Sequence, residues 1–296
     1  MRVIGVGDNV VDKYIHTGMM YPGGNALNFA VYASRLGAES AYLGVFGSDR
    51  AGHLVREAAQ NEGVALTHCQ TRKGENGFAC VDLIGGDRRF VHSNKGGIAG
   101  REPMVLSLRE VDYLSTFDLI VSSINSCMTD ELPKMNLPGI PLAFDFSERH
   151  DYETLREFCP HLDYAVLSAG KLSLTATLAK VQQCHDLGAT YVLATLGARG
   201  ALFSNRLRYF LSPARKIAAR DSLGAGDAYL TAFLLCHVSR QHKQGDVRTA
   251  EQESQRVRDC MGKGNALAAL VCLQDGAFGY GTPISENLDN EKGCCL

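Results

Sequence analysis

The sequence lacks an excess of either charge. Thirty Lys and Arg stand against 32 Asp and Glu among 296 residues, a net charge of −2. There is no basic surplus to hold nucleic acid and no acidic tail, so we expect no nucleic-acid partner. The hydrophobic fraction of 45% is that of an ordinary globular protein, which excludes collagen, coiled coil and disorder. The length allows one large α/β unit or two smaller ones.

Long hydrophobic runs are also missing. The longest stretch without Asp, Glu, Lys or Arg covers residues 14–34, and Pro, Gly and Asn residues interrupt it. A membrane span needs about 20 consecutive apolar residues, so this stretch is not one. The N-terminus has a single early basic residue, Arg2, and acidic Asp8 and Asp12 soon follow, which is unlike a secretion signal. We expect a cytoplasmic protein without a membrane partner.

The cysteines and histidines lack the spacing of a disulfide framework or a structural zinc site. The ten cysteines include no C-x-x-C, and only Cys294 and Cys295 adjoin. In a cytoplasmic protein this pattern favours buried free thiols over disulfides. The nine histidines show neither H-x-x-x-H nor H-E-x-x-H spacing. We therefore expect no structural zinc site.

Apolar strands alternate with amphipathic helices along most of the chain. This order predicts an α/β fold with a mostly parallel sheet flanked by helices on both faces. Two short extended runs joined by Gly85, Gly86 and Asp87 predict a hairpin outside the main core, which could form a small sheet with the region around Tyr14. The expected strands cover 2–6, 41–46, 64–71, 119–123, 141–146, 164–168 and 191–195, and the expected helices 25–36, 51–63, 102–114, 152–158, 174–187, 225–240 and 251–273.

The strongest local motif is DSLGAGD at residues 221–227, directly before an apolar helical run. Small residues at a helix N-terminus leave backbone N–H groups open, and the helix dipole adds positive potential there, so an anion should bind. Asp227 in the first turn could then accept a proton from an attacking hydroxyl. Asp227 does not need a raised pKa for this role, because the hydroxyl becomes acidic only as it attacks, and at a helix N-terminus we expect the carboxylate to stay ionised. Taken alone, the heptapeptide fits a tight turn with a capping Asp equally well.

Two further glycine clusters begin or end regular elements. PGGNALN at residues 22–28 opens a helix about ten residues after Asp12, and carboxylate, amide and bare backbone together suit a polyhydroxylated ligand. TLGARG at residues 195–200 ends a parallel strand, where ligands gather in open α/β sheets. Each cluster on its own also fits a plain turn.

Together these motifs resemble a known family. The pair GGNALN and DSLGAGDAYLTAFL, about 200 residues apart, is similar to the signatures of the ribokinase-like carbohydrate kinases, the PfkB family, and the resemblance spans residues 2–283. Within that family, GDNVVDKY, FDFSER and PHLDYA are most similar to kinases that act on fructoselysine at its 6-position. The resemblance implies an ATP-dependent phosphotransferase that uses Mg²⁺ and places the γ-phosphate on a hydroxyl of a sugar or ketosamine.

The resemblance also implies roles for single positions. Asp227 matches the base that deprotonates the sugar hydroxyl, and Asn25 stands where relatives often have Lys. The remaining matches are an anion hole at Gly224, Ala225 and Gly226, sugar contacts at Asp12, Gly23, Gly24 and Asn28, nucleotide contacts at Thr195, Gly197, Gly200 and Asn265, and a ligand of a monovalent cation such as K⁺ at Asp221.

One position departs from the family pattern. Many relatives carry N-x-x-E, whose Glu orders Mg²⁺ and its water, where this chain has Ser168-Ala169-Gly170-Lys171. Mg²⁺ held chiefly by nucleotide phosphates and water remains compatible with this change. We hypothesise that Lys171 supplies positive charge near the phosphates instead.

The hairpin looks like part of the family's lid. The implied division is a main domain of residues 1–13, 23–74 and 97–284, a β lid of 14–22 and 75–96, and a flexible tail of 285–296. In ribokinase-like dimers the lid pairs with a second copy, so we expect a homodimer. Lid charges at Glu75, Asp87, Arg88 and Arg89 could read the zwitterion of a fructosylated lysine, although a solvated hairpin explains them more simply. Arg149 is the better substrate-binding candidate because it follows the carboxyl end of a strand.

Three alternatives to this function remain. A nucleoside kinase of the same fold shares the GAGD element. A dinucleotide-dependent dehydrogenase is disfavoured, because Val10 stands where G-x-G-x-x-G needs its third glycine. A sugar-binding protein without turnover is supported only by the missing acid at Lys171, and the intact Asp227 argues against it.

Overall fold

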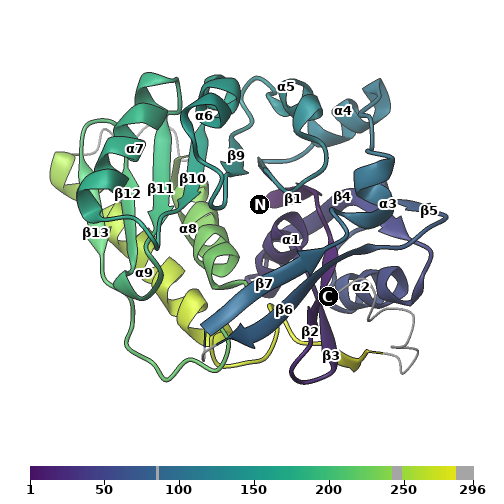
Figure 1. Cartoon of the computed structure of the whole chain (residues 1–296). Helices are drawn as coiled ribbons and strands as arrows, with labels where there is room; N and C mark the ends of the chain where they lie inside the picture. Colours follow the sequence, from purple (N-terminus) through teal and green to yellow (C-terminus); the bar gives the residue numbers. More distant parts are fainter. Residues whose placement is uncertain (85–86, 242–248, 285–296) are drawn as a thin grey trace.

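Two β-sheets organise the chain (Figure 1). The computed structural model describes residues 1–84, 87–241 and 249–284. Within them, a nine-stranded sheet has the order β13 (Tyr209–Ser212), β12 (Ala201–Ser204), β11 (Tyr191–Thr195), β10 (Tyr164–Ser168), β9 (Leu142–Asp145), β8 (Leu119–Ser123), β1 (Arg2–Gly7), β4 (Glu39–Gly47) and β5 (Gln70–Arg72). A five-stranded sheet has the order β14 (Thr282–Pro283), β3 (Met19–Gly23), β2 (Val10–Tyr14), β6 (Gly77–Ile84) and β7 (Asp87–Ser93).

Helices cover both faces of the larger sheet. They are α1 (Asn25–Arg35), α2 (Arg50–Asn61), α3 (Gly97–Arg101), α4 (Leu108–Leu114), α5 (Leu132–Met135), α6 (Tyr152–Phe158), α7 (Leu174–Asp186), α8 (Ala225–Gln241) and α9 (Ala250–Val271). Within the described ranges, no helix is both long and apolar enough to cross a membrane.

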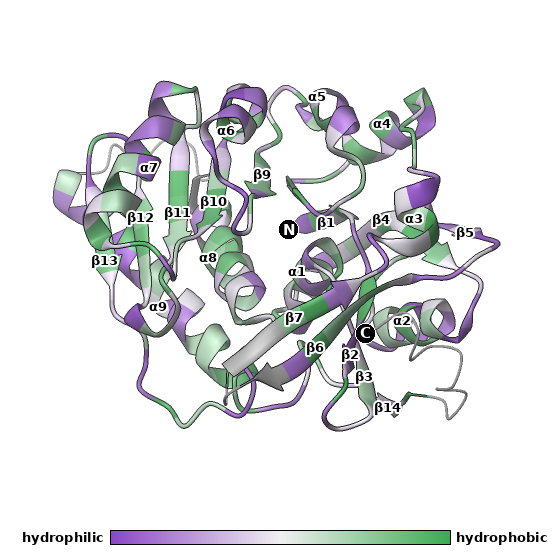
Figure 2. Ribbon diagram, viewed as in Figure 1, coloured by the Kyte–Doolittle hydropathy of each residue, from purple (hydrophilic) through white to green (hydrophobic). Residues whose placement is uncertain are grey.

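Successive residues of each central strand enter different cores. In β1, Val3 packs with Phe29 of α1 and Phe233 of α8, whereas Ile4 packs with residues of α4 to α7 such as Leu155. This alternation follows from the two-residue period of a strand that is buried on both faces. The central strands β10 and β11 are correspondingly apolar in Figure 2.

The larger sheet is parallel from β5 to β11, as expected, and its last two strands are antiparallel. Neither β12 nor β13 was among the expected strands, because four-residue strands carry too little periodicity to stand out. The carboxyl ends of the parallel strands all lie at one edge of the sheet. Ligands bind at this edge in open α/β folds.

Two other expected elements are wrong in detail. The expected helix 102–114 shortens to α4 (Leu108–Leu114), because Pro103 does not continue a helix and Ser107 begins α4 with a capping box to Glu110. The separate helix α3 (Gly97–Arg101) ends before the expected start and was not predicted. The expected strand 64–71 shortens to β5, with one isolated bridge between Ala41 and Ala65.

The smaller sheet contains the expected hairpin of β6 and β7. One of its faces packs on α2 through Val11, Met20 and Phe78. Adjacent side chains of a strand point to opposite faces, so Asp12 and Tyr14 lie on the other side. This sheet takes in β2 and therefore begins at Val10, within the segment that the sequence places in the main domain. The expected tail 285–296, with Cys294 and Cys295, and the side chains of Asp87, Arg88 and Arg89 lie outside the described residues.

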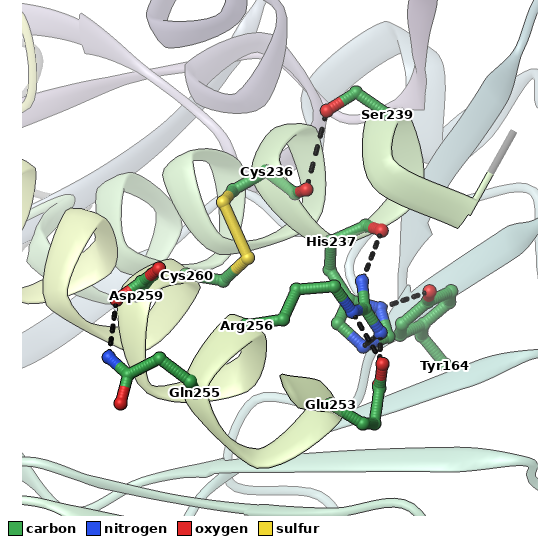
Figure 3. The surroundings of a disulfide bond; sticks show 9 residues. All are labelled: Tyr164, Cys236, His237, Ser239, Glu253, Gln255, Arg256, Asp259 and Cys260. Carbon is green, nitrogen blue, oxygen red and sulfur yellow. Dashed lines mark hydrogen bonds and ion pairs between the residues drawn. A yellow bond between two sulfur atoms is a disulfide. The ribbon is translucent and has the colours of Figure 1, made fainter. Parts of the chain in front are cut away.

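A disulfide joins Cys236 of α8 to Cys260 of α9, with 5.3 Å between their Cα atoms (Figure 3). The expectation of free thiols is therefore wrong for these two. Their spacing of 24 residues carries no motif, and only the packing of the two helices brings them together. In the described part of the chain, Cys69, Cys127, Cys159 and Cys184 are free thiols, as expected.

A buried polar network lies beside this disulfide (Figure 3). Arg256 is paired with Glu253, and its guanidinium faces Nε2 of His237 at 2.9 Å. A guanidinium can only donate, so Nε2 accepts and the Nδ1–H of His237 donates to the Tyr164 hydroxyl, 2.7 Å away. This network ties α9 to α8 and β10.

Candidate active site

Asp227 lies in the first turn of α8 and faces the start of α1. Its Oδ1 accepts a hydrogen bond from Asn25 Nδ2 at 2.9 Å, and its Oδ2 accepts one from Asn28 Nδ2 at 2.7 Å. The carboxylate is buried, with 8% of the residue exposed. The structure thus brings together the DSLGAGD and GGNALN motifs, about 200 residues apart, at a single carboxylate.

A second buried carboxylate, Asp145, stands beside it. Asp145 ends β9, and its Oδ2 accepts from the same Asn25 Nδ2 at 3.2 Å, while its Oδ1 accepts from the Ser147 N–H at 2.7 Å. The sequence assigned no role to Asp145. Its position at the carboxyl end of a parallel strand, within FDFSER, is the signal that could have found it.

Burial and neighbouring carboxylates raise the pKa of both acids. Burial raises the pKa of Asp227 to about 8, and the nearby Asp145 adds to the rise, while the amides of Asn28 and Asn25 oppose it. Burial likewise raises the pKa of Asp145 to about 6. The expectation that Asp227 stays ionised is therefore wrong at neutral pH, because the loss of water and a like charge outweigh the helix dipole.

We predict that kcat/KM rises with pH up to about 8, since Asp227 must lose its proton before it can accept another. Asp145→Asn removes a neighbouring negative charge and should move this acid limb to lower pH. The measurement is kcat/KM across the neutral and alkaline range for both proteins. An acid limb with the same midpoint in both would contradict the coupling.

The expected sugar-contacting positions lie next to Asp227. A Cβ on Gly23 would lie only 2.5 Å from Asp12 Oδ2, so the bare backbone lets this buried carboxylate approach. Gly24 precedes α1 with φ of 113°, a conformation that favours glycine. Among the described residues, the buried Oδ1 of Asn28 has no hydrogen-bond partner. An unpartnered buried acceptor fits a hydroxyl donor from a ligand.

Asp8 anchors this group from β1. Its carboxylate accepts from the backbone N–H of Asn25 at 2.6 Å and of Ala26 at 3.3 Å, and from the Ser123 hydroxyl at 2.9 Å. The sequence assigned no role in the site to Asp8. The structure shows that it fixes the first turn of α1, from which Asn25 and Asn28 reach Asp227.

The turn before α8 is shaped for an anion. Gly224 has φ of 74°, and a Cβ there would lie 2.5 Å from the Tyr32 hydroxyl. A Cβ on Gly226 would meet nothing within 4 Å, so the backbone faces open space there. The first-turn amides of a helix have no carbonyl of their own helix to bond, and their dipole favours negative charge. A phosphoryl group fits this opening.

The expected nucleotide positions lie at the ends of β10 and β11. Ser168 and Thr195 are register partners on these parallel strands. Gly197, with φ of 60°, begins the short 3₁₀ turn Gly197–Arg199. Arg199 Nη2 donates to the carbonyls of Ala169, Gly170 and Leu172, which holds the two loops together.

Other expected nucleotide positions have structural partners. A Cβ on Gly200 would lie 2.0 Å from the Ser212 carbonyl oxygen, so Gly200 lets the loop after β13 pack closely. Asn265 of α9 donates to Ser212 Oγ at 2.7 Å and to the Pro213 carbonyl at 3.1 Å. These contacts fix the same loop from the helix side.

Comparison with known proteins decides the family. The model of the pfkB family carbohydrate kinases matches residues 1–138 and 153–283. The chain belongs to this family. It is an ATP-dependent sugar kinase, and the expected ribokinase-like α/β fold is confirmed.

Curated relatives include two kinases of sugar amines. The chain is 37% identical to a fructosamine kinase of Bacillus subtilis (strain 168) over 96% of this chain and 95% of the relative. It is 30% identical to a fructoselysine 6-kinase of Escherichia coli (strain K12) over 77% of this chain and 86% of the relative. Among solved structures, Arabidopsis thaliana ribokinase complexed with ribose and ATP matches with a TM-score of 0.77 at 19% identity, covering 94% of each chain.

The described part of this pfkB kinase lacks a cluster of side chains that could hold a metal ion by itself. In the described residues, no group of three or more His, Cys, Asp or Glu could hold an ion. Lys171, in place of the family's acid, pairs with Glu148 at 2.7 Å and keeps 80% of its side chain exposed. The chemistry of these residues fits Mg²⁺ that arrives on nucleotide phosphates and keeps most of its waters.

The expected cation ligand, Asp221, is already surrounded by donors. Its Oδ2 accepts from the Tyr14 hydroxyl and from the Gly276 N–H at 3.0 Å, and its Oδ1 accepts from the Leu223 N–H at 2.7 Å. Three donors occupy most of the lone-pair positions of this carboxylate, and its role as a ligand of a monovalent cation stays a prediction. Asp221 also links the smaller sheet, through Tyr14, to the anion turn.

Proposed function

We propose that this kinase transfers the γ-phosphate of ATP to a hydroxyl of a ketosamine such as fructoselysine, at the 6-position. Asp227 removes the hydroxyl proton as the oxygen attacks phosphorus. A new P–O bond forms, the bond between the β- and γ-phosphates breaks, and ADP leaves. The amides of Gly224, Ala225 and Gly226 stabilise the charge that spreads over the transferring group. Mg²⁺ bound to the phosphates would neutralise further charge.

One observation carries this proposal. Asp227, the carboxylate beside the anion turn, is held by two amides of the Gly-Gly-Asn helix, so a sugar at Asp12, Gly23 and Asn28 would place a hydroxyl next to a base. Proximity of this kind supplies much of the rate in phosphoryl transfer. The choice of a ketosamine is supported by the two relatives named for fructosamine and fructoselysine.

A phosphorylation screen tests the substrate. The purified enzyme is incubated with ATP·Mg²⁺ and a panel of ketosamines, free sugars and nucleosides, and the products are read by mass and by the position of the phosphate. We expect phosphorylated ketosamine with the phosphate on O6. Turnover of nucleosides alone would contradict the substrate, and turnover of nothing in the panel would favour a binding protein.

The smaller sheet is proposed to act as the lid over this substrate. Its face with Asp12 and Tyr14 is joined to the active site through Asp221, and its edge strand β7 exposes Phe90 and Val91. Exposed apolar residues on an edge strand favour pairing with a second copy. We propose a homodimer through this lid, and sedimentation of the purified protein tests it.

Lys171 is proposed to lie near the nucleotide phosphates. We predict that Lys171→Ala raises the KM for ATP by roughly fivefold or less, because an exposed charge already paired with Glu148 contributes about 1 kcal/mol at most. Steady-state titrations of ATP and Mg²⁺ measure this, with Lys180→Ala on α7 as the control. Unchanged dependence on both would remove Lys171 from the phosphate site.

A further inference from the structure

A chain of hydrogen bonds runs from the surface to the proposed base. Arg149 Nη2 donates to Asn125 Oδ1, and Asn125 Nδ2 donates to Asn25 Oδ1 at 2.9 Å. Asn25 Nδ2 then donates to Asp227 Oδ1 and to Asp145 Oδ2. These hydrogen bonds connect the loop after β9, the loop after β8 and the first turn of α1 at the carboxyl edge of the sheet.

The chemistry of the two ends gives this chain a direction. The guanidinium of Arg149 can only donate, and the carboxyl oxygens of Asp145 and Asp227 that face Asn25 accept from it. Each side-chain amide has one accepting end and one donating end. With Arg149 donating at the start, Asn125 must present its NH₂ group to Asn25, and Asn25 must present its own NH₂ group to Asp227. The reverse orientation of Asn25 would set its oxygen against two carboxylates.

Arg149 is also held from the backbone. Its Nη2 donates to the Ile124 carbonyl at 3.2 Å, while its side chain remains exposed. Ser147, two residues earlier, has φ of 52°, an uncommon conformation for a residue with a side chain. The loop after β9 therefore holds both Asp145 and Arg149 in defined places around Asn25.

We propose that Asn125 and Arg149 are positioning residues, which fix the orientation of the Asn25 amide so that it donates to Asp227. This inference rests on the proposed role of Asp227 as the base. It also changes the role expected for Arg149 from a substrate contact to a residue that acts through two amides. Neither Asn125 nor Arg149 needs to touch the sugar for this effect.

The groups around Asp227 determine how its pKa would change if the hydrogen bonds from Arg149 to Asn25 were lost. Asp145 at the end of β9 and Asp8 after β1 both raise its pKa, while Asn25 and Asn28 of α1 lower it. Tyr32 of α1 also feels the charge of Asp227 and has a raised pKa of its own, chiefly from burial. If Asn25 turns over, Asp227 loses one donor and faces an oxygen, so its proton affinity rises further and the base is scarcer at neutral pH.

Two pairs of variants test the proposal in the full-length enzyme. Asn125→Ala breaks the chain while Arg149 keeps its charge. Arg149→Met removes the donor, and Arg149→Lys restores a donor-only group. Both positions are exposed, so the fold should tolerate these changes. Asn136→Ala, at an exposed residue after α5, is the matched control.

The readouts are kcat, the KM for substrate and ATP, and the pH profile. We expect Asn125→Ala and Arg149→Met to lower kcat by roughly tenfold, the cost of one lost hydrogen bond to a charged group, with KM changed by less than about threefold. The acid limb should move to higher pH, and Arg149→Lys should recover most of the loss seen in Arg149→Met.

Other results would overturn the proposal. A raised KM at unchanged kcat would make these residues substrate contacts, and an acid limb that stays in place would leave the base independent of them. If Arg149→Lys were as slow as Arg149→Met, the lower kcat would not come from losing the donor-only side chain that orients the Asn125 and Asn25 amides. A wild-type enzyme that phosphorylates no sugar would instead defeat the proposed function, so the two failures differ.

Discussion

Asp227→Asn is expected to lower kcat by ~10²-fold or more, the scale of a lost general base. An amide has nearly the shape of the carboxylate but cannot take the hydroxyl proton. Because the pKa of Asp227 is raised to about 8, the native site already holds a neutral acid at neutral pH, so the neutral amide should cost little stability. Substrate and ATP should still bind.

The measurements are kcat, ligand affinity by calorimetry and the thermal midpoint. Asp112→Asn, on the exposed side of α4, makes the same chemical change away from the site and should leave all three as they are. Turnover near that of the native enzyme in Asp227→Asn would remove Asp227 from the mechanism. A collapse of the thermal midpoint would assign it a structural role.

Gly224→Ala is expected to remove most activity and to destabilise the fold. The added Cβ would lie 2.5 Å from the Tyr32 hydroxyl and 2.7 Å from the Ala277 Cβ, and Tyr32 is fixed by its own hydrogen bond to the Ala277 carbonyl. The turn must therefore shift, which moves the amides away from the charge they stabilise. Loss of such a donor costs ~10²-fold in kcat or more. The left-handed φ of Gly224 adds roughly 1 kcal/mol of strain.

The control Gly139→Ala separates the effect of backbone strain from that of a steric clash. Gly139 has a similar φ of 80°, but a Cβ there would meet nothing within 4 Å. We expect this control to lower the thermal midpoint slightly and to keep the kcat of the native enzyme. If Gly224→Ala behaved like Gly139→Ala in both kcat and thermal midpoint, the anion turn would not depend on the close contact with Tyr32.

The fold could be anticipated where local pattern and tertiary environment agree. Strands β8, β10 and β11 match the expected bounds, and so does α6, because a strand buried on both faces or a capped amphipathic helix carries its signal in its own residues. The short antiparallel strands β12 and β13 and the short helix α3 could not be predicted this way. Short elements depend on their neighbours more than on their own periodicity.

The residues of the candidate site also fall into two groups, those that a local pattern predicts and those that depend on distant partners. Glycines before a helix with an acid in its first turn are a local pattern, so Gly224, Gly226 and Asp227 could be singled out from the sequence. Asp8, Asp145 and Asn125 could not be given a role, because each acts through a partner from a distant segment. Arg149 could be singled out as a candidate substrate contact, but its hydrogen bond to Asn125 could not be predicted, since Asn125 comes from another loop.

The sequence by itself determined the α/β alternation, the family and the two glycine motifs, because propensity, periodicity and backbone freedom reside in neighbouring residues. Only the tertiary structure decided that Asp145 raises the pKa of Asp227, that Cys236 meets Cys260, and that two asparagines connect Arg149 to Asp227. These properties depend on burial and on contacts between segments far apart in the chain, which no local pattern encodes.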